Sequence, residues 1–419
     1  MRSKPQHQTI LRGARCAFGT QEPELASIQV SGKRITRILK RPPLLSACSP
    51  DSSEIDLTGF LLMPGLINAH DHLEFSLFPR LANPPYGNYV DWGLDIHNSF
   101  PHIIAKYRAV PKPVRLWWGG VRNLLCGATT VSHHNPLWPD LQTADFPVRV
   151  VQEYGWGHSL ALGGNLRAAR ASTPANRAFI LHAGEGVDDR ARDELWNIDR
   201  LGLLDAATVL VHGLAIDKEG VQLMRSRGAS LIVCPSSNKF LFGELPDLSV
   251  LGQIGKVALG TDSPLTACGN LLDEINFAIR SCNISPQIAY RMITEAPTTI
   301  LRLQHSEGSL KVSGIADLIA IHDTGDNAPE RLQSLSMVDI EFVMLGGRVQ
   351  LASENVLRRI PPLAKQGLEP LSVGGILRWV RVPVKELMRK TEDVLGTGEV
   401  HLGGKPVTIP AWAATRQAS

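Results

Sequence analysis

The chain has no long apolar run. No stretch approaches the roughly 18 to 20 consecutive apolar residues that a membrane-spanning helix needs, and the first residues contain no apolar segment of signal-peptide length. The six cysteines, at positions 16, 48, 126, 234, 268 and 282, include no CxxC pair. This spacing excludes a disulfide framework and a cysteine-rich zinc site, and it is typical of a reduced protein. We therefore expect a cytoplasmic location.

The chain also has little excess charge. Its 43 Lys and Arg residues nearly balance 40 Asp and Glu residues, which leaves a net charge of +3, and no block of basic residues occurs. Nucleic acid and membranes are therefore not expected partners. We expect a small-molecule substrate, and further copies of the chain in a dimer or larger homo-oligomer. With 419 residues, 43% of them hydrophobic, the chain is long enough for two domains.

Between residues 65 and 305, short apolar runs alternate with segments of helix length. The runs are continuously apolar, which is typical of parallel strands buried on both faces. They lie at 127–131, 148–152, 178–182, 208–212, 231–234 and 257–261, and helices are predicted at 189–201, 218–227 and 271–281. This alternation predicts an α/β fold with a (β/α)₈ barrel; a doubly wound sheet is the alternative.

The two ends of the chain have a different pattern of apolar residues. Residues 1–64 and 306–360 carry short aliphatic and β-branched runs broken by Gly, Ser and Pro, as strands do. We predict that they form one small β-sandwich domain built from both chain termini. Residues 361–419 form a Pro-rich C-terminal extension in which only a helix at about 375–389 is predicted.

Metal-binding residue types stand where several predicted strands end. His70 and His72 are two residues apart at the end of one run, and this spacing directs both imidazoles to the same face of a strand. Other runs end in His182, His212 and Asp262. The carboxyl ends of barrel strands converge on one rim, so these side chains can meet there. Imidazole and carboxylate ligands suit zinc or ferrous iron.

Five segments carry a resemblance to a known family. PGLINAHDH, LHAGEG, VLVHG, VCPSSN and LGTDSP occur in this order, and together they resemble the metal-dependent amidohydrolase superfamily. The similarity is to the branch of cytosine and guanine deaminases, imidazolonepropionase and triazine chlorohydrolases. It implies a distorted TIM-like barrel with a β-sandwich made from both termini, in agreement with the pattern of apolar runs.

The resemblance also implies roles for individual residues. His70, His72 and His182 match metal ligands, and Asp262 matches the residue of the eighth strand that both binds metal and accepts a proton from water. Glu185 matches an acid that moves protons to the leaving group, and His212 matches a histidine beside the water and substrate. The metal would lower the pKa of water, and hydroxide would attack a trigonal carbon.

Some positions depart from the family pattern. No lysine lies between Lys112 and Lys218, so a bridging carboxylated lysine has no candidate, and one divalent ion per chain is expected, zinc or alternatively iron. Glu153, after the predicted fourth strand, and His133 and His134, after the predicted third, could line the substrate pocket or hold a second ion. Asn238 resembles a residue that positions the substrate or a loop.

The resulting prediction is a hydrolase that attacks a trigonal carbon of a small cyclic or heterocyclic substrate. Deamination at a C–N bond is the preferred reaction, because the position of Glu185 supplies a proton donor for a ring nitrogen. The alternatives are an enzyme that opens a cyclic amide or displaces another leaving group such as chloride, and a catalytically silent metal-binding relative. A loop at 78–87, rich in Pro and aromatic residues, and Trp92 could form a lid or wall of the site.

Overall fold

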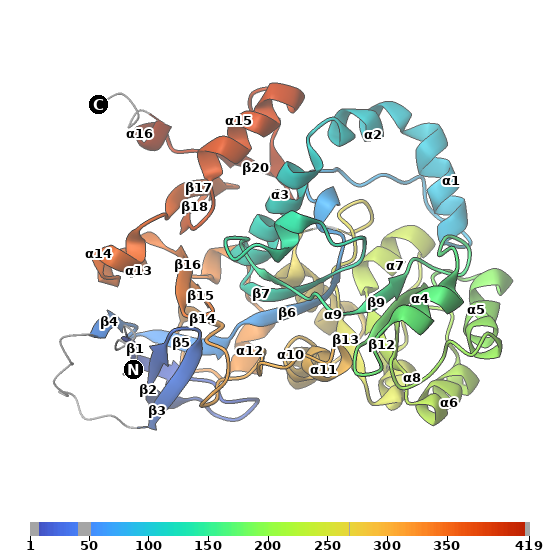
Figure 1. Cartoon of the computed structure of the whole chain (residues 1–419), viewed down its shortest axis with the longest axis horizontal. Coiled ribbons are helices and arrows are strands. Elements are labelled where there is room, and N and C mark those ends of the chain that lie inside the picture. Colours follow the sequence, from blue (N-terminus) through green and yellow to red (C-terminus); the bar gives the residue numbers. More distant parts are fainter. Residues whose placement is uncertain (1–7, 41–51, 268, 415–419) are drawn as a thin grey trace.

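The computed structural model describes residues 8–40, 52–267 and 269–414 (Figure 1). Two of the six cysteines, Cys48 and Cys268, lie outside these ranges, and the other four are free thiols. Within the described ranges, no helix has both the length and the apolar character required to cross a bilayer.

Eight parallel strands form an incomplete barrel. Three lie in one sheet and five in another: β6 (Leu66–Asp71), β7 (Ala128–His133) and β8 (Arg149–Val150), then β9 (Gly155–Gly157), β10 (Phe179–Ala183), β11 (Thr208–His212), β12 (Ser230–Val233) and β13 (Val257–Leu259). The sheets meet where the backbone N–H groups of Thr261 and Asp262 donate to the carbonyl oxygen of His70, at 2.9 and 3.1 Å. Among the described residues β8 and β9 are not paired with each other; only four residues separate them, and the 149–157 segment pairs with β7 through β8 and with β10 through β9.

The strand order corrects one prediction. The run at 127–131 belongs to β7, which pairs directly with β6 and is therefore the second barrel strand, not the third. The third strand, β8, has only two residues, and the fourth, β9, has three. The sequence of β9, Gly155–Gly157, is Gly-Trp-Gly and contains no run of aliphatic residues, which is why the sequence pattern did not reveal this strand.

Helices cover the outside of the barrel. They are α3 (Lys112–Leu125), α4 (Leu166–Ser172), α5 (Asp189–Arg200), α6 (Lys218–Arg227), α7 (Pro235–Phe242), α8 (Leu248–Leu251), α9 (Leu271–Ser281), α10 (Pro286–Met292) and α11 (Glu295–Ile300). The prediction for α6 and α9 is confirmed, and that for α5 differs by one residue. For α6, the Asp217 side chain accepts from the N–H of Gly220, and Gly228 ends the helix in the left-handed conformation at φ 71°.

Both chain ends contribute to one further sheet of twelve strands. From the N-terminal part come β1 (Gln8–Cys16), β2 (Glu24–Ser31), β3 (Arg34–Lys40), β4 (Ser52–Asp56) and β5 (Phe60–Pro64). From the later part come β14 (Leu318–His322), β15 (Phe342–Leu345) and β16 (Arg348–Ala352), with α12 (Ala328–Leu332) between the first two. The antiparallel pairing of β5 with β14 joins the two ends, as the strand pattern predicted.

The C-terminal extension continues this sheet. After α13 (Glu354–Arg359) and α14 (Pro362–Lys365), it adds β17 (Glu369–Val373), β18 (Ile376–Val380), β19 (His401–Leu402) and β20 (Lys405–Thr408), with α15 (Val384–Leu395) before β19 and α16 (Ala411–Ala414) at the end. The predicted helix at 375–389 is wrong in its first half. Gly374 and Gly375 both have positive φ and make the tight turn of a β17–β18 hairpin, so the helix starts only at Val384.

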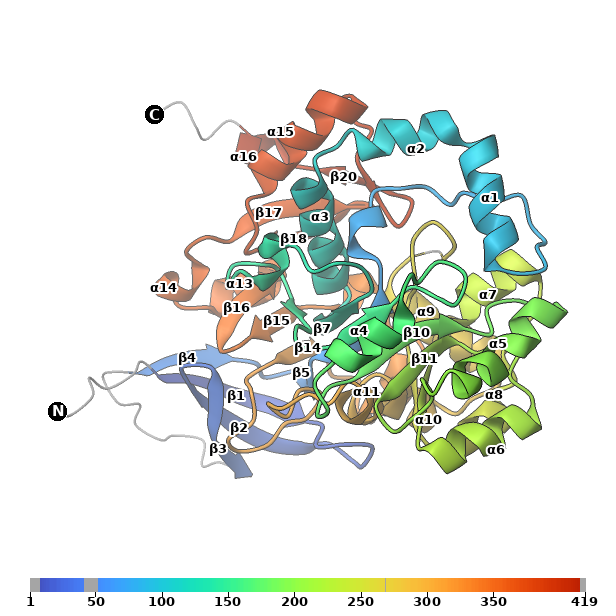
Figure 2. The ribbon, with the colours of Figure 1, turned by 45° about the vertical axis from the view of Figure 1, so that its right-hand side comes forward.

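Two helices lie outside the ring of barrel helices. The chain leaves β6 through a short 3₁₀ turn, η1 (Leu73–Phe75), and then forms α1 (Tyr89–Ser99) and α2 (Pro101–Arg108). Figures 1 and 2 show these two helices as an arm at the edge of the molecule, beyond the barrel strands. We call α1 and α2 the arm.

A buried ion pair holds the end of β6 in place. Asp71 stands between the two histidines of the HxH motif, and its side chain is fully buried. Nη2 of Arg122, on α3, lies 2.7 Å from both carboxylate oxygens of Asp71. The side-chain amide of Asn123 donates to the same carboxylate at 2.7 Å. Arg122 also donates to the carbonyl of Gly269, which follows β13. The pair therefore links β6, α3 and the segment after β13.

This pair yields a stability prediction. Arg122→Met should lower the free energy of unfolding by roughly 3–5 kcal/mol, because it leaves the Asp71 carboxylate buried without its counter-charge. The matched control is Arg192→Met, which removes the exposed partner of Asp189 and should change stability by less than about 1 kcal/mol. Urea unfolding followed by circular dichroism measures both. Equal effects of the two substitutions would contradict the role given to Arg122.

Candidate active site

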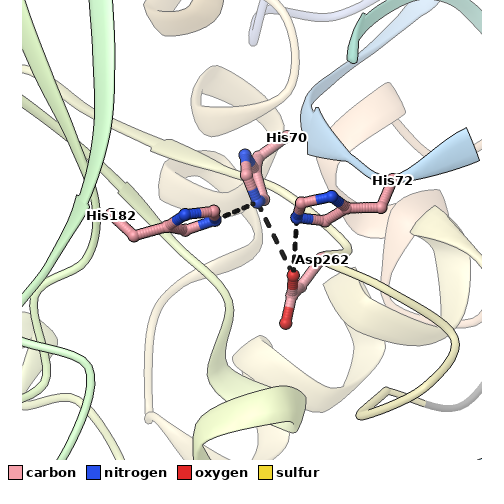
Figure 3. Close-up of side chains that lie close together, drawn as sticks. All are labelled: His70, His72, His182 and Asp262. Atoms are coloured by element: carbon pink, nitrogen blue, oxygen red, sulfur yellow. Dashed lines mark hydrogen bonds and ion pairs between the residues drawn. The ribbon is translucent and has the colours of Figure 1, made fainter. Parts of the chain in front are cut away.

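Four candidate metal ligands meet at one end of the barrel (Figure 3). His70 and His72 come from the end of β6, His182 from β10, and Asp262 follows β13; one ligand atom from each lies within 4.8 Å of the others. Oδ1 of Asp262 is 3.6 Å from Nε2 of His70 and from Nε2 of His72. Nε2 of His182 is 3.1 Å from Nε2 of His70. These four residues were predicted from the sequence as metal ligands, and the fold places them close together.

The chemistry of these atoms fits a cation. Nδ1 of His182 lies 2.8 Å from the carbonyl oxygen of His158, and a carbonyl only accepts, so this nitrogen carries the proton. Its Nε2 therefore directs a lone pair at the nitrogen of His70. Burial lowers the pKa of His70 to about 3 and that of His182 well below its usual value, which keeps both rings neutral. Three nitrogens and a carboxylate oxygen are a typical zinc ligand set.

Asp262 is held with its two oxygens facing different partners. Oδ1 faces the imidazoles, whereas Oδ2 accepts from the hydroxyls of Ser237 at 2.6 Å and Thr266 at 2.8 Å. Burial alone would raise the pKa of Asp262, but the contacts of its carboxylate with the imidazoles of His70, His212 and His72 outweigh burial and bring the pKa well below its usual value. The carboxylate is therefore ionised across the physiological pH range.

Glu185 has the opposite protonation. Its side chain is buried, and Oε2 lies 3.5 Å from Nε2 of His212. Burial, and then the charges of Asp262 and Glu194, raise the pKa of Glu185 well above its usual value. The environment of Glu185 therefore favours its protonated form, which is the state that a proton donor requires.

The arm holds the loop that carries Glu185. The backbone N–H of Tyr89, the first residue of α1, donates to the carbonyl of Glu185 at 3.1 Å. The Tyr89 hydroxyl donates to Oε1 of Glu194 at 2.8 Å, and the other oxygen of Glu194 accepts from the N–H of Gly184. Gly186 has no room for a side chain, because a Cβ would lie 2.5 Å from the carbonyl oxygen of Gly87.

His212 ends β11 and faces Glu185. Nδ1 of His212 is 3.0 Å from Oδ1 of Asn238 on α7, and this contact leaves Nε2 directed at the Glu185 carboxyl. Asn238 is completely buried and does not line the cavity. The structure therefore gives it a contact with His212 in place of the predicted contact with substrate.

His133 and His134, which were predicted to line the substrate pocket or to hold a second ion, do not line the cavity. His133 lies behind the ligands, with Nδ1 accepting from the N–H of Leu73 and Nε2 3.4 Å from Glu74. His134 packs its ring 4.2 Å from that of His182 and contacts the carbonyl of Gly157. Both are buried; His134 packs against the candidate ligand His182, and His133 contacts η1, the turn that follows His72.

Glu153 is separate from the site. Its side chain is 68% exposed and pairs with Arg177. Glu153 precedes β9, and the first residue of β9 pairs with the first residue of β10, so Glu153 lies at the amino end of the strands. The carboxyl ends, where the candidate ligands gather, are at the other end of the barrel, which explains why the prediction for Glu153 is wrong.

His158 was missed by the sequence reasoning. It follows β9, its carbonyl sets the proton position of His182, and its ring lines the cavity. The signal available was a histidine after a short apolar stretch, but a strand of three residues is too short to identify by its periodicity.

A cavity of about 220 Å³ opens beside the four candidate ligands. Its inner end carries His72, His182, Glu185, His212 and Asp262. Much of the remaining lining is apolar: Phe75, Phe78, Leu81, Trp92, Ile96, Ile104, Leu162 and Leu265. The predicted wall formed by the 78–87 loop and Trp92 is therefore present, through Phe78, Leu81 and Trp92.

Comparison with known proteins agrees with the fold. The model of the amidohydrolase family matches residues 172–349. The 5-methylthioadenosine/S-adenosylhomocysteine deaminase 2 of Archaeoglobus fulgidus is 23% identical over 386 residues, which cover 77% of this chain and 87% of the relative. Guanine deaminase of Mus musculus is 29% identical over 190 residues, which cover 42% of this chain and 39% of that protein.

A solved structure of atrazine chlorohydrolase from Arthrobacter aurescens, complexed with zinc, superposes with a TM-score of 0.69 at 18% identity and covers 92% of this chain and 99% of that chain. This likeness shows a TIM-barrel-like domain joined to a β-rich domain. The family match over residues 172–349, the deaminase relatives and this likeness of fold agree that the chain is similar to amidohydrolase-family proteins.

Proposed function

We propose that this protein is a zinc-dependent deaminase that replaces an exocyclic amino group of a small heterocycle by oxygen and releases ammonia. The observation that carries this proposal is the pair of buried carboxyl groups in opposite environments beside one cluster of candidate ligands: Asp262 faces imidazoles and two hydroxyl donors, whereas Glu185 faces His212 in a buried position that raises its pKa. Replacing an amine requires both a base for water and an acid for the ring nitrogen. The deaminase names of the relatives support the same reaction.

The side chains divide the work as follows. A divalent ion bound by His70, His72, His182 and Asp262 would act as a Lewis acid and lower the pKa of water. Asp262, which is ionised, accepts the proton of the attacking water. Glu185 donates its proton to the ring nitrogen next to the reacting carbon. His212, fixed by Asn238, presents Nε2 to Glu185 and to the oxygen that is added.

The proposal is tested by ammonia release from a panel of aminopurines, aminopyrimidines, aminotriazines and aminopterins by the zinc-loaded protein. At least one ring class should release ammonia. If none does while a cyclic amide is opened or a chlorotriazine loses chloride, the reaction is hydrolysis without deamination. If the protein retains zinc and turns over none of these compounds, it is a silent relative.

We predict close to one tightly bound zinc per chain. The support is a single cluster of suitable ligands in the described part of the chain and the zinc in the related solved structure. His182→Ala should reduce the zinc content severalfold after dialysis, because a four-ligand site loses a large part of its affinity with one ligand. Elemental analysis measures this, with the exposed His102→Ala as the control. Two ions per chain, or full occupancy in His182→Ala, would contradict the prediction.

A second prediction separates the two carboxyl groups. Glu185→Gln should keep the full zinc content and a KM near that of the wild type, while kcat falls by about a hundredfold or more, the usual contribution of a positioned acid. Asp262→Asn should abolish turnover and also weaken zinc retention. Steady-state kinetics with elemental analysis of the same samples measures both variants.

The pH dependence has a definite sign. Because the pKa of Glu185 is raised and its protonated form is the active one, kcat should fall as the pH rises through that value. The residual activity of Glu185→Gln should lack this alkaline limb. Near wild-type turnover by Glu185→Gln on the true substrate would refute the proton-donor role and leave hydrolysis without deamination as the better explanation.

A further inference from the structure

The outer part of the cavity is bounded by its own apolar cluster. Phe78, Leu81, Ile96, Ile104 and Leu265 are buried and form a hydrophobic group distinct from the barrel core, with Phe75 and Trp92 packed against it. All seven side chains line the same cavity as Glu185 and the candidate metal ligands. Trp92, Ile96 and Ile104 belong to the arm, so the arm is one wall of the binding site.

This wall is held in a defined shape. The indole N–H of Trp92 donates to the carbonyl of Leu81 at 2.9 Å. The ring of Phe78 meets Phe75 edge to face at 5.4 Å and packs against Tyr107 at 5.1 Å. Aromatic side chains fixed in this way form a surface that need not reorganise when a ligand binds.

Polar groups are segregated along the cavity. The ionisable side chains lie either at the inner end, around the candidate ligands, or at the exposed residues His97 and Arg108. The wall between them offers a ligand only carbon atoms and aromatic faces. A charged group placed there would lose its hydration without a partner, whereas each buried methylene would strengthen binding about fourfold.

We propose that the substrate is an aminoheterocycle bearing a short, uncharged, apolar substituent, which lies against the arm while the ring faces Glu185. The inference rests on the proposed function for the ring and on the wall for the substituent. A cavity of about 220 Å³ is smaller than typical ligand pockets of roughly 300–1,000 Å³, so the substituent is short. A free base such as guanine would leave the wall unused.

Binding of compounds that cannot be deaminated tests the wall independently of catalysis. The probes are 9-methylpurine, 9-butylpurine and 9-(3-carboxypropyl)purine, none of which carries an amino group, together with 2-methyl- and 2-butylpyrimidine. Isothermal titration calorimetry with the zinc-loaded protein measures each Kd. In at least one ring series butyl should bind about tenfold or more tightly than methyl, and the carboxypropyl compound should bind no more tightly than methyl.

Two matched pairs of variants locate the effect. Ile104 lines the cavity, whereas its neighbour Ile103 on α2 is 37% exposed and does not. Ile104→Thr should reduce the butyl gain to less than about threefold, and Ile103→Thr should retain it. On α1, Ile96→Thr and the control Leu94→Thr form the second pair, because Leu94 is 62% exposed. Circular dichroism and zinc content verify that each variant is folded.

The outcomes separate the two proposals. No gain from butyl in either series, tighter binding of the carboxypropyl compound, or a gain that survives in both Ile104→Thr and Ile96→Thr overturns the inference about the substituent. Ammonia release from unsubstituted bases together with no butyl gain refutes this inference and leaves deamination intact. A butyl gain that depends on Ile104, with no ammonia from any compound of the panel, refutes deamination and leaves the apolar wall intact.

Discussion

The buried ion pair between Asp71 and Arg122 is the constraint on which the site depends. The two histidines of the HxH motif point to one side of β6, and Asp71 between them points to the other, where it meets Arg122 and Asn123 of α3. Arg122 also reaches Gly269 beyond β13, and Asn68 of β6 donates to the hydroxyl of Thr261. These contacts at the β6–β13 junction keep His70 and His72 opposite Asp262. A charge buried without its partner is strongly unfavourable, so this geometry is tightly specified.

Opposite environments then give two buried carboxyl groups opposite protonation states. Asp262 faces imidazoles and accepts hydrogen bonds from Ser237 and Thr266, and these interactions favour its charged form. Glu185 is equally buried, but its charged neighbours are the carboxylates of Asp262 and Glu194, which oppose ionisation. Similar chemical groups thus become a base and an acid within one cavity, as environment-dependent pKa shifts allow. Ionisation of Asp262 itself helps to keep Glu185 protonated.

The arm and the C-terminal extension, which lie outside the barrel, both contact segments that position the site residues. The arm supplies the apolar wall and, through Tyr89, holds the loop of Glu185. The C-terminal extension packs on the same helix that carries Arg122, since the indole N–H of Trp118 on α3 donates to the hydroxyl of Thr391 on α15. Helix α15 therefore supports α3 from outside, while Asp71 contacts α3 from inside.

The sequence by itself determined the local geometry of the ligands. A spacing of two in an extended strand puts His70 and His72 on one face, and ligand-type residues after buried apolar runs predict convergence at the carboxyl ends of parallel strands. The helix-length segments between the apolar runs likewise located α6 and α9. These features depend on neighbours within a few positions, so a single sequence reveals them.

Only the tertiary structure decided which distant groups meet. Glu153 and His158 flank the same three-residue strand, yet one is exposed beside Arg177 and the other contacts His182, because they stand at opposite ends of β9. Asn238 contacts His212 and His134 packs against His182, and neither residue lines the cavity. The hairpin at Gly374 and Gly375 replaces part of a predicted helix. The identity of a contact partner, the protonation of Glu185 and the apolar wall all depend on residues far apart in the chain, which local patterns do not encode.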